Sequence, residues 1–146
     1  MIEARSTHCV FEDLGTGAKL SDLTINELYT TPKFPPENIL WGEKYFFLRE
    51  EFNEARSNRF TSEVNTVLVT FGAADPSDFT RKIFRSIFPY CAEKKIKIFL
   101  VTGGGYSHIE KLKNEIAHIP ESQVQYVHKT GVISHIMEQS QIAIAG

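Results

Sequence analysis

A strand, a turn of small residues and a helix start follow one another in Thr66-Val-Leu-Val-Thr-Phe-Gly-Ala-Ala-Asp-Pro76. Its first six residues are almost all β-branched or apolar, which is typical of a strand whose sheet is covered by helices on both faces. Asp75 suits an N-cap and Pro76 the first helical position, where an N–H has no intrahelical partner. The stretch therefore predicts a strand and then a helix. The predicted buried stripe of that helix is Phe79, Ile83, Phe84, Ile87 and Phe88.

The alternation of short apolar runs with amphipathic runs continues to the end of the chain. Further strands are predicted over 96–102, 124–127 and 142–145. Ser107 and Glu110 have the spacing of a capping box before a second helix, and a short third helix follows. The apolar positions of these two helices are Ile109, Leu112, Ile116, Val132, Ile133, Ile136 and Met137. This order predicts an α/β, Rossmann-like parallel sheet of the form βαβαβαβ, with its ligand edge at the carboxyl ends of the strands.

The residues before this unit predict a different organisation. Short strands are expected at 9–11 and 23–25, within residues 1–40. Residues 41–64 are interpreted as an aromatic-rich linker, and residues 65–146 as the parallel-sheet domain. The prolines at 32, 35 and 36 break up the intervening stretch. The aromatic residues predicted to pack mainly against the parallel-sheet unit are Trp41, Tyr45, Phe46 and Phe47.

Composition limits the classes of partner. The chain has 146 residues and a formal net charge of -2, which gives no electrostatic basis for binding nucleic acid. No apolar run approaches the length of a membrane span and no signal sequence is apparent, so a cytoplasmic location is expected. Cys9 and Cys91 lack paired spacing and are expected to be reduced and buried. The five histidines show no metal-binding spacing, so neither a metal nor a cofactor is predicted.

Two glycine-containing turns are the candidates for binding an anion. Gly72 and Ala73 precede a helix start at Asp75, and small residues there let the backbone approach a phosphate. The alternative is a simple tight connection between strand and helix. Gly103 and Gly104 follow the second strand without the Gly-x-Gly-x-x-Gly order of a dinucleotide site. His128, just past the third strand, is placed at the ligand edge.

Three segments together resemble a known family. They are Val10-Phe-Glu-Asp-Leu-Gly15 with Asp22-Leu-Thr-Ile-Asn26, then Leu40-Trp-Gly-Glu-Lys-Tyr-Phe-Phe-Leu-Arg-Glu-Glu-Phe52, then Val69-Thr-Phe-Gly-Ala-Ala-Asp-Pro76. The chain resembles the nucleotide-sugar hydrolases of pseudaminic acid synthesis and the related SpsG-type polysaccharide proteins, which share the fold of the MurG-type glycosyltransferases. The resemblance covers nearly the whole chain. Ala73 departs from it, because a second Gly is usual at that place.

The resemblance implies two Rossmann-like domains that hold a UDP-sugar in their cleft. In that picture residues 1–40 are the remnant of the N-terminal domain, and residues 65–146 are the nucleotide-sugar-binding domain, truncated at its C-terminus. The Gly72 turn would approach the ligand from one side, the backbone of Val127 and His128 would lie beside the base, and Ile133 and Met137 would lie beneath it. Gly146 would open a further Gly-rich turn. The nucleotide-sugar-binding residues so predicted are Gly72, Ala73, Asp75, Gly103, Gly104, Val127, His128, Ile133, Met137 and Gly146.

The resemblance also implies an activity, in which water attacks the anomeric carbon and releases UDP. The family uses a histidine of its N-terminal domain, and none of the five histidines here matches that place, so no catalytic residue is assigned. The chain is expected to be part of such a hydrolase, inactive alone and binding UDP no tighter than about 1 mM. A glycosyltransferase of the same architecture is the alternative enzyme. A noncatalytic protein that associates with itself or with a complementing chain is the third hypothesis.

Overall fold

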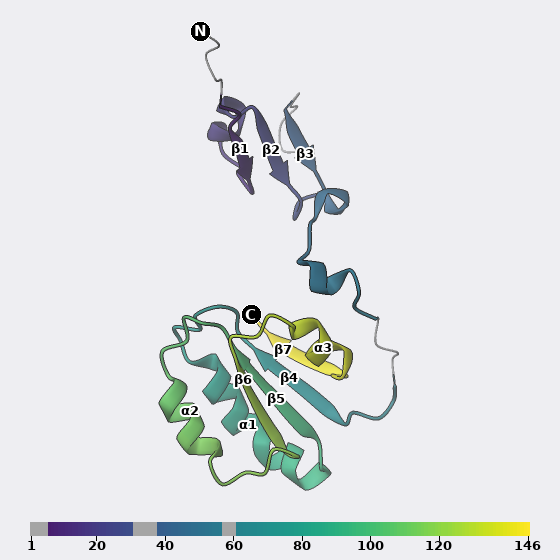
Figure 1. The fold of residues 1–146 in the computed structure, drawn as a ribbon, viewed down its shortest axis with the longest axis vertical. Coiled ribbons are helices and arrows are strands. Elements are labelled where there is room, and N and C mark those ends of the chain that lie inside the picture. The colour runs from purple at the N-terminus through teal and green to yellow at the C-terminus, as the bar shows by residue number, and fades with distance from the viewer. Residues whose placement is uncertain (1–5, 31–37, 57–60) are drawn as a thin grey trace. The chain divides into compact units, whose positions relative to one another are not determined.

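The computed structural model describes residues 6–30, 38–56 and 61–146, and the chain forms two compact units, Met1–Arg49 and Glu50–Gly146 (Figure 1). Each unit contains its own parallel sheet. The proline-containing stretch that the sequence suggested as a break lies outside the described residues. No helix among the described residues combines the length and the apolar character that crossing a bilayer requires.

The C-terminal unit alternates strands and helices along the chain. Its strands are β4 (Thr66–Thr70), β5 (Lys97–Thr102), β6 (Val124–His128) and β7 (Ile142–Ala145). Its helices are α1 (Phe79–Lys94), α2 (Ile109–Ile116) and α3 (Ile133–Glu138), after a short 3-10 helix, η3 (Glu50–Phe52). All strand pairs are parallel and the strand order is β6-β5-β4-β7. The predicted Rossmann-like α/β unit of four parallel strands and three intervening helices is confirmed.

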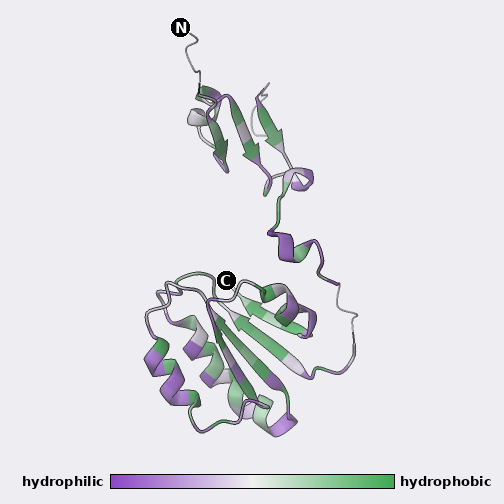
Figure 2. Ribbon diagram, in the orientation of Figure 1, coloured by the Kyte–Doolittle hydropathy of each residue, from purple (hydrophilic) through white to green (hydrophobic). Residues whose placement is uncertain are grey.

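Helices cover both faces of this sheet, and the core alternates between the faces along each strand. Val69 and Leu100 pack with Phe84 of α1 and Leu112 of α2 on one face. On the other face Leu68, Phe99 and Val101 pack with Ile136 of α3. The strands are mostly apolar, whereas the helices also carry hydrophilic residues (Figure 2). Continuous apolar strands are what burial on both faces requires.

The N-terminal unit holds a three-stranded parallel sheet. Its strands are β1 (Cys9–Phe11), β2 (Leu23–Asn26) and β3 (Ile39–Trp41), in the order β1-β2-β3, with 3-10 helices η1 (Thr16–Leu20) and η2 (Glu43–Tyr45). The two predicted strands are present, and β3 is a strand that the sequence did not suggest. Cys9 is exposed rather than buried, whereas Cys91 is buried. A three-residue edge strand with a single hydrogen-bonded neighbour leaves its side chains open to solvent.

Two of the four aromatic residues expected on the parallel-sheet unit pack elsewhere. Trp41 belongs to β3 and pairs with Asn26 of β2. The Phe47 ring makes an edge contact with Phe11 of β1, with ring centroids 5.3 Å apart. Trp41 is thus part of the N-terminal sheet, and the expectation is wrong for Phe47, whose ring contacts Phe11 of that sheet.

The starts of two helices differ from the sequence prediction. α1 begins at Phe79, and its N-cap residue is Asp78 in the left-handed conformation, with φ 55°. Pro76 therefore precedes the helix, and Phe79 is exposed rather than part of the buried stripe. The N-cap residue of α2 is His108, which makes no side-chain cap bond, so the capping box of Ser107 with Glu110 does not form. In both cases the turn before the helix is longer than the sequence pattern suggested.

Candidate functional site

The strand order creates a topological switch point between β4 and β7. The connection from β4 runs through α1 on one sheet face, and the chain returns through α3 on the other face to reach β7. In open α/β sheets such a point leaves a crevice outside the carboxyl ends of the two strands. Gly72 follows β4 with φ 69°, and a Cβ there would lie 4.0 Å from the carbonyl oxygen of Gly146, just after β7. The two predicted residues Gly72 and Gly146 therefore lie close together at the switch point.

The two glycine-containing turns lie against each other at this edge. Gly103 N–H donates to the Gly72 carbonyl at 3.2 Å, and Gly105 N–H donates to the Ala73 carbonyl at 2.9 Å. A Cβ on Gly103 would lie only 2.4 Å from the Ala73 Cα, so the close backbone approach requires glycine at 103. A Cβ on Gly104 would meet only the Lys129 side chain, at 3.6 Å. Gly103 thus joins the turns, and Gly104 is exposed beside them.

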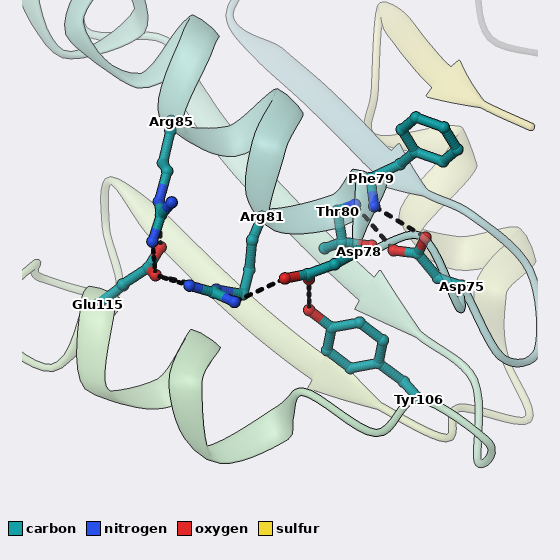
Figure 3. Close-up of polar contacts among 8 residues, drawn as sticks. All are labelled: Asp75, Asp78, Phe79, Thr80, Arg81, Arg85, Tyr106 and Glu115. Carbon is teal, nitrogen blue, oxygen red and sulfur yellow. Dashed lines mark hydrogen bonds and ion pairs between the residues drawn. The ribbon is translucent and has the colours of Figure 1, made fainter.

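Asp75 caps α1 from before the helix (Figure 3). Its Oδ1 accepts the Phe79 N–H and its Oδ2 the Thr80 N–H, both at 2.8 Å, and the residue is 5% exposed. Burial opposes ionisation, but the hydrogen bonds from the backbone of Thr80 and Phe79 outweigh it and hold the pKa of Asp75 below its ordinary value. The carboxylate stays charged and occupies N–H groups that a phosphate would otherwise use.

A chain of polar contacts connects the turn after β5 to the start of α1 and to α2 (Figure 3). Tyr106, 2% exposed, donates its hydroxyl hydrogen to Asp78 Oδ1 at 2.5 Å, and Arg81 binds Asp78 Oδ2 at 2.6 Å. Arg81 also pairs with Glu115 of α2 at 2.5 Å, and Arg85 pairs with the same carboxylate. Sequence reasoning missed this network, because nothing in the apolar periodicity shows which polar residues of α1 and α2 meet.

The ionisation of this network follows from its contacts. The hydrogen bond to Glu115 raises the pKa of Arg81 above its ordinary value. Burial opposes ionisation of Glu115, but its hydrogen bonds from Arg85 and Arg81 lower its pKa overall. Burial, and then the hydrogen bond to Asp78, raise the pKa of Tyr106 far above the usual range. Tyr106 is therefore a permanent donor, and Arg81 and Glu115 remain charged.

The end of β6 contributes residues to both faces of the sheet. Val127 is partly buried with Ile133 in the α3-side core. His128 is exposed, and its Nδ1 lies 3.1 Å from Oγ1 of Thr102 at the end of β5. Met137 lies one turn along α3 from Ile133 and is exposed. Val127 and Ile133 therefore belong to the core. The predicted residues that lie at the carboxyl edge of the sheet are Gly72, Ala73, Asp75, Gly103, Gly104, His128 and Gly146.

The N-terminus of α3 has a carboxylate partner of its own. Glu51 Oε2 accepts the Ser134 N–H at 2.9 Å, and Glu138 Oε1 accepts the Arg56 N–H at 2.5 Å. The segment from Glu51 to Arg56 is therefore attached along α3. Helices α1 and α3 thus each have a side-chain carboxylate on the N–H groups of their first turn.

Among residues 6–30, 38–56 and 61–146, no three or more His, Cys, Asp or Glu side chains are grouped as a metal site would need. No family model matches the chain. The chain is 27% identical over 123 residues to an uncharacterized protein of Methanocaldococcus jannaschii, a match that covers 76% of this chain and 25% of that protein. The chain thus spans about a quarter of the length of this relative. This similarity assigns no activity.

Proposed function

We propose that this chain forms part of the nucleotide-sugar site of a hydrolase that releases a sugar from UDP by water attack at the anomeric carbon. The setting would be the synthesis of a surface polysaccharide or a nonulosonic acid. The observation that carries the proposal is the approach of Gly72 to Gly146 at the switch point between β4 and β7. A phosphate-bearing ligand is the class that such crevices bind in Rossmann-like folds.

Backbone groups are the main donors available to a diphosphate in this proposal. Asp75 occupies the N–H groups of Phe79 and Thr80 at the start of α1, so that helix offers little to a phosphate. The exposed turns at Gly72–Ala73 and Gly104 remain. Lys129, with φ 54°, packs its aliphatic stem against Gly104, and it forms no salt bridge within the described part of the chain. The proposal assigns its ammonium group as a source of positive charge for a diphosphate.

The proposal assigns no general base within the described residues. Hydrolysis at the anomeric carbon needs a base within hydrogen-bond reach of the attacking water. Asp75 is engaged as a cap, and both Asp78 and Glu115 are paired with arginines. The chain is accordingly expected to bind UDP weakly and to hydrolyse no UDP-sugar by itself.

Calorimetric titration with UDP tests the proposal, with a charge placed in the crevice as the probe. Ala73 is exposed beside Gly72, so Ala73→Glu adds a carboxylate that repels a diphosphate. The matched control is Ser122→Glu, which adds the same charge just before β6, at the opposite end of the sheet. Weak binding of about 1 mM that is lost in the first variant and kept in the second is expected. Equal loss in both variants would contradict the placement.

A further inference from the structure

Three polar side chains meet at the carboxyl ends of β5 and β6. Thr102 Oγ1 lies 2.8 Å from the Tyr126 hydroxyl and 3.1 Å from His128 Nδ1. Thr102 is the register partner of His128, and Tyr126 precedes His128 by two residues, so all three share one sheet face. Thr102 is 2% exposed, whereas His128 is exposed. The cluster therefore reaches from the buried sheet to the edge beside the glycine turns.

The hydrogens of this cluster have a preferred direction. Each hydroxyl has one hydrogen to donate, and a neutral imidazole has one donor nitrogen and one acceptor nitrogen. The phenol of Tyr126 is more acidic than the aliphatic hydroxyl of Thr102, so Tyr126 donates and Thr102 accepts. The Thr102 hydrogen is then left for His128 Nδ1. In that arrangement the proton of the neutral ring resides on Nε2, because Nδ1 is the acceptor.

We infer that Tyr126 and Thr102 are positioning residues that hold His128 as an Nε2–H donor to an oxygen acceptor of a ligand at this edge. The inference rests on the proposed function for the ligand class, a uridine nucleotide. Such a ligand offers two kinds of acceptor, a carbonyl oxygen of the base and an oxygen of the phosphates. Both accept from Nε2–H in the same way, so the ligands tested include uridine and inorganic phosphate separately.

Nitrogen-15 NMR of the imidazole rings tests the positioning step without any ligand. The spectra are recorded at about pH 8.5, about two pH units above the ordinary pKa of a free imidazole. His128 is expected to show one tautomer, with Nε2 protonated and Nδ1 as the acceptor. The exposed His118 in the same sample shows the reference mixture of a solvated ring. A His128 spectrum that matches His118, or one with Nδ1 protonated, would overturn the inference.

Three variants separate positioning from mere packing. Thr102→Val keeps the branched shape and removes the hydroxyl, so the His128 signals should move to those of the tautomer mixture. Thr102→Ser keeps the hydroxyl and should restore the single tautomer. Tyr126→Phe removes the outer donor and should raise the fraction with Nδ1 protonated, because Thr102 is then free to accept. If the Val and Phe variants both retain the wild-type His128 signals, the inference is wrong.

Titration of the same samples with UDP, uridine and inorganic phosphate at millimolar concentrations tests the ligand step. The His128 Nε2 signal should shift with UDP in the wild type and in Thr102→Ser, and this shift should be lost in Thr102→Val. A shift with uridine assigns the acceptor to the base, and a shift with phosphate assigns it to the phosphates. If UDP shifts the glycine-turn amides but leaves Nε2 unmoved, the inference fails while the proposed function stands. If UDP shifts neither the glycine-turn amides nor the His128 Nε2 signal, the proposed function fails.

Discussion

The hydroxyl of Tyr106 donates a hydrogen bond to Oδ1 of Asp78 over 2.5 Å, and it thereby joins the turn after β5 to the residue that starts α1. Asp78 has φ 55°, in the left-handed region that non-glycine residues seldom adopt. Such a conformation persists where surrounding contacts fix it. The hydrogen bond from Tyr106 and the ion pair with Arg81 supply those contacts. The conformation of the turn between β4 and α1 therefore depends on these two residues.

Replacing Tyr106 with Phe removes this hydrogen bond and keeps the ring. Hydrogen bonds to a charged group contribute about 1.5–3 kcal/mol, so a loss of that order in the free energy of unfolding of the C-terminal unit is expected. Hydrogen exchange of the amides in β4 and β5 measures it. The matched control is Tyr90→Phe at an exposed tyrosine, where a change within about 0.5 kcal/mol is expected. Equal effects of the two variants would contradict the role given to Tyr106.

The glycine turns offer a second matched pair. Gly103→Ala places a Cβ 2.4 Å from the Ala73 Cα, so one turn must move away from the other, at a cost of about 1–3 kcal/mol. Gly104→Ala meets only the Lys129 side chain at 3.6 Å, an ordinary contact, and should be nearly neutral. Thermal unfolding and the amide chemical shifts of Gly72 to Ala74 report both effects. A neutral Gly103→Ala would show that the turns do not touch as described.

Asp75→Asn tests the cap through its dependence on pH. The folded-state pKa of Asp75 is lowered, so its charged form stabilises the fold above the ordinary carboxyl pKa of about 4. That stabilisation is lost as the pH falls through the lower folded value. The wild type should therefore be more stable than the variant near pH 7, by about 1 kcal/mol, and this difference should shrink toward pH 2.

The control for this pH dependence is Glu121→Gln, at an exposed glutamate. Its stability should parallel that of the wild type throughout the titration. A stability difference between Asp75→Asn and the wild type that is constant from pH 7 to pH 2 would show that the Asp75 charge does not contribute.

The same Asp75→Asn variant should bind UDP more tightly than the wild type does. The substitution removes a negative charge from the start of α1, where the helix dipole favours an anion. A gain of about 0.3–1 kcal/mol corresponds to roughly a 2- to 5-fold lower dissociation constant. Glu121→Gln again serves as the control, with unchanged affinity. An affinity unchanged by Asp75→Asn would mean that the diphosphate lies away from this helix, and weaker binding would contradict the expected repulsion.

The parallel sheet of the C-terminal unit could be predicted because its residues obey simple periodicity. Val67, Leu68 and Val69 form a continuous apolar run, and the helices repeat apolar residues at helical spacing. Local polar chemistry was less predictable. Asp75 does cap α1, but it bonds N–H groups four and five residues ahead, so the helix starts later than an adjacent cap would imply. Sequence spacing alone does not distinguish these two geometries.

The location of the candidate site at the carboxyl edge of the sheet could be predicted, but the contacts within the site could not. Parallel strands bring their carboxyl ends together, and this placed Gly72, Gly103 and His128 at one edge. The contact of Gly103 with Ala73 and the bond from Tyr106 to Asp78 depend on how two separate turns pack. Strand β3, Ile39–Trp41, was missed because it follows the prolines at 35 and 36, which were interpreted as a break in the chain.

Mapping the amide shifts caused by UDP onto the chain tests the central claim most directly. The claim is that a uridine nucleotide binds at the carboxyl edge of the four-stranded sheet, where Gly72 approaches Gly146. Titration to about 10 mM UDP, well above the expected dissociation constant of about 1 mM, should shift the amides of Gly72, Ala73, Gly104, His128 and Gly146 most strongly. The amides near Lys95 and Ser122, at the opposite end of the sheet, should stay unmoved. Shifts confined to that opposite end, or no shifts at all, would contradict the claim.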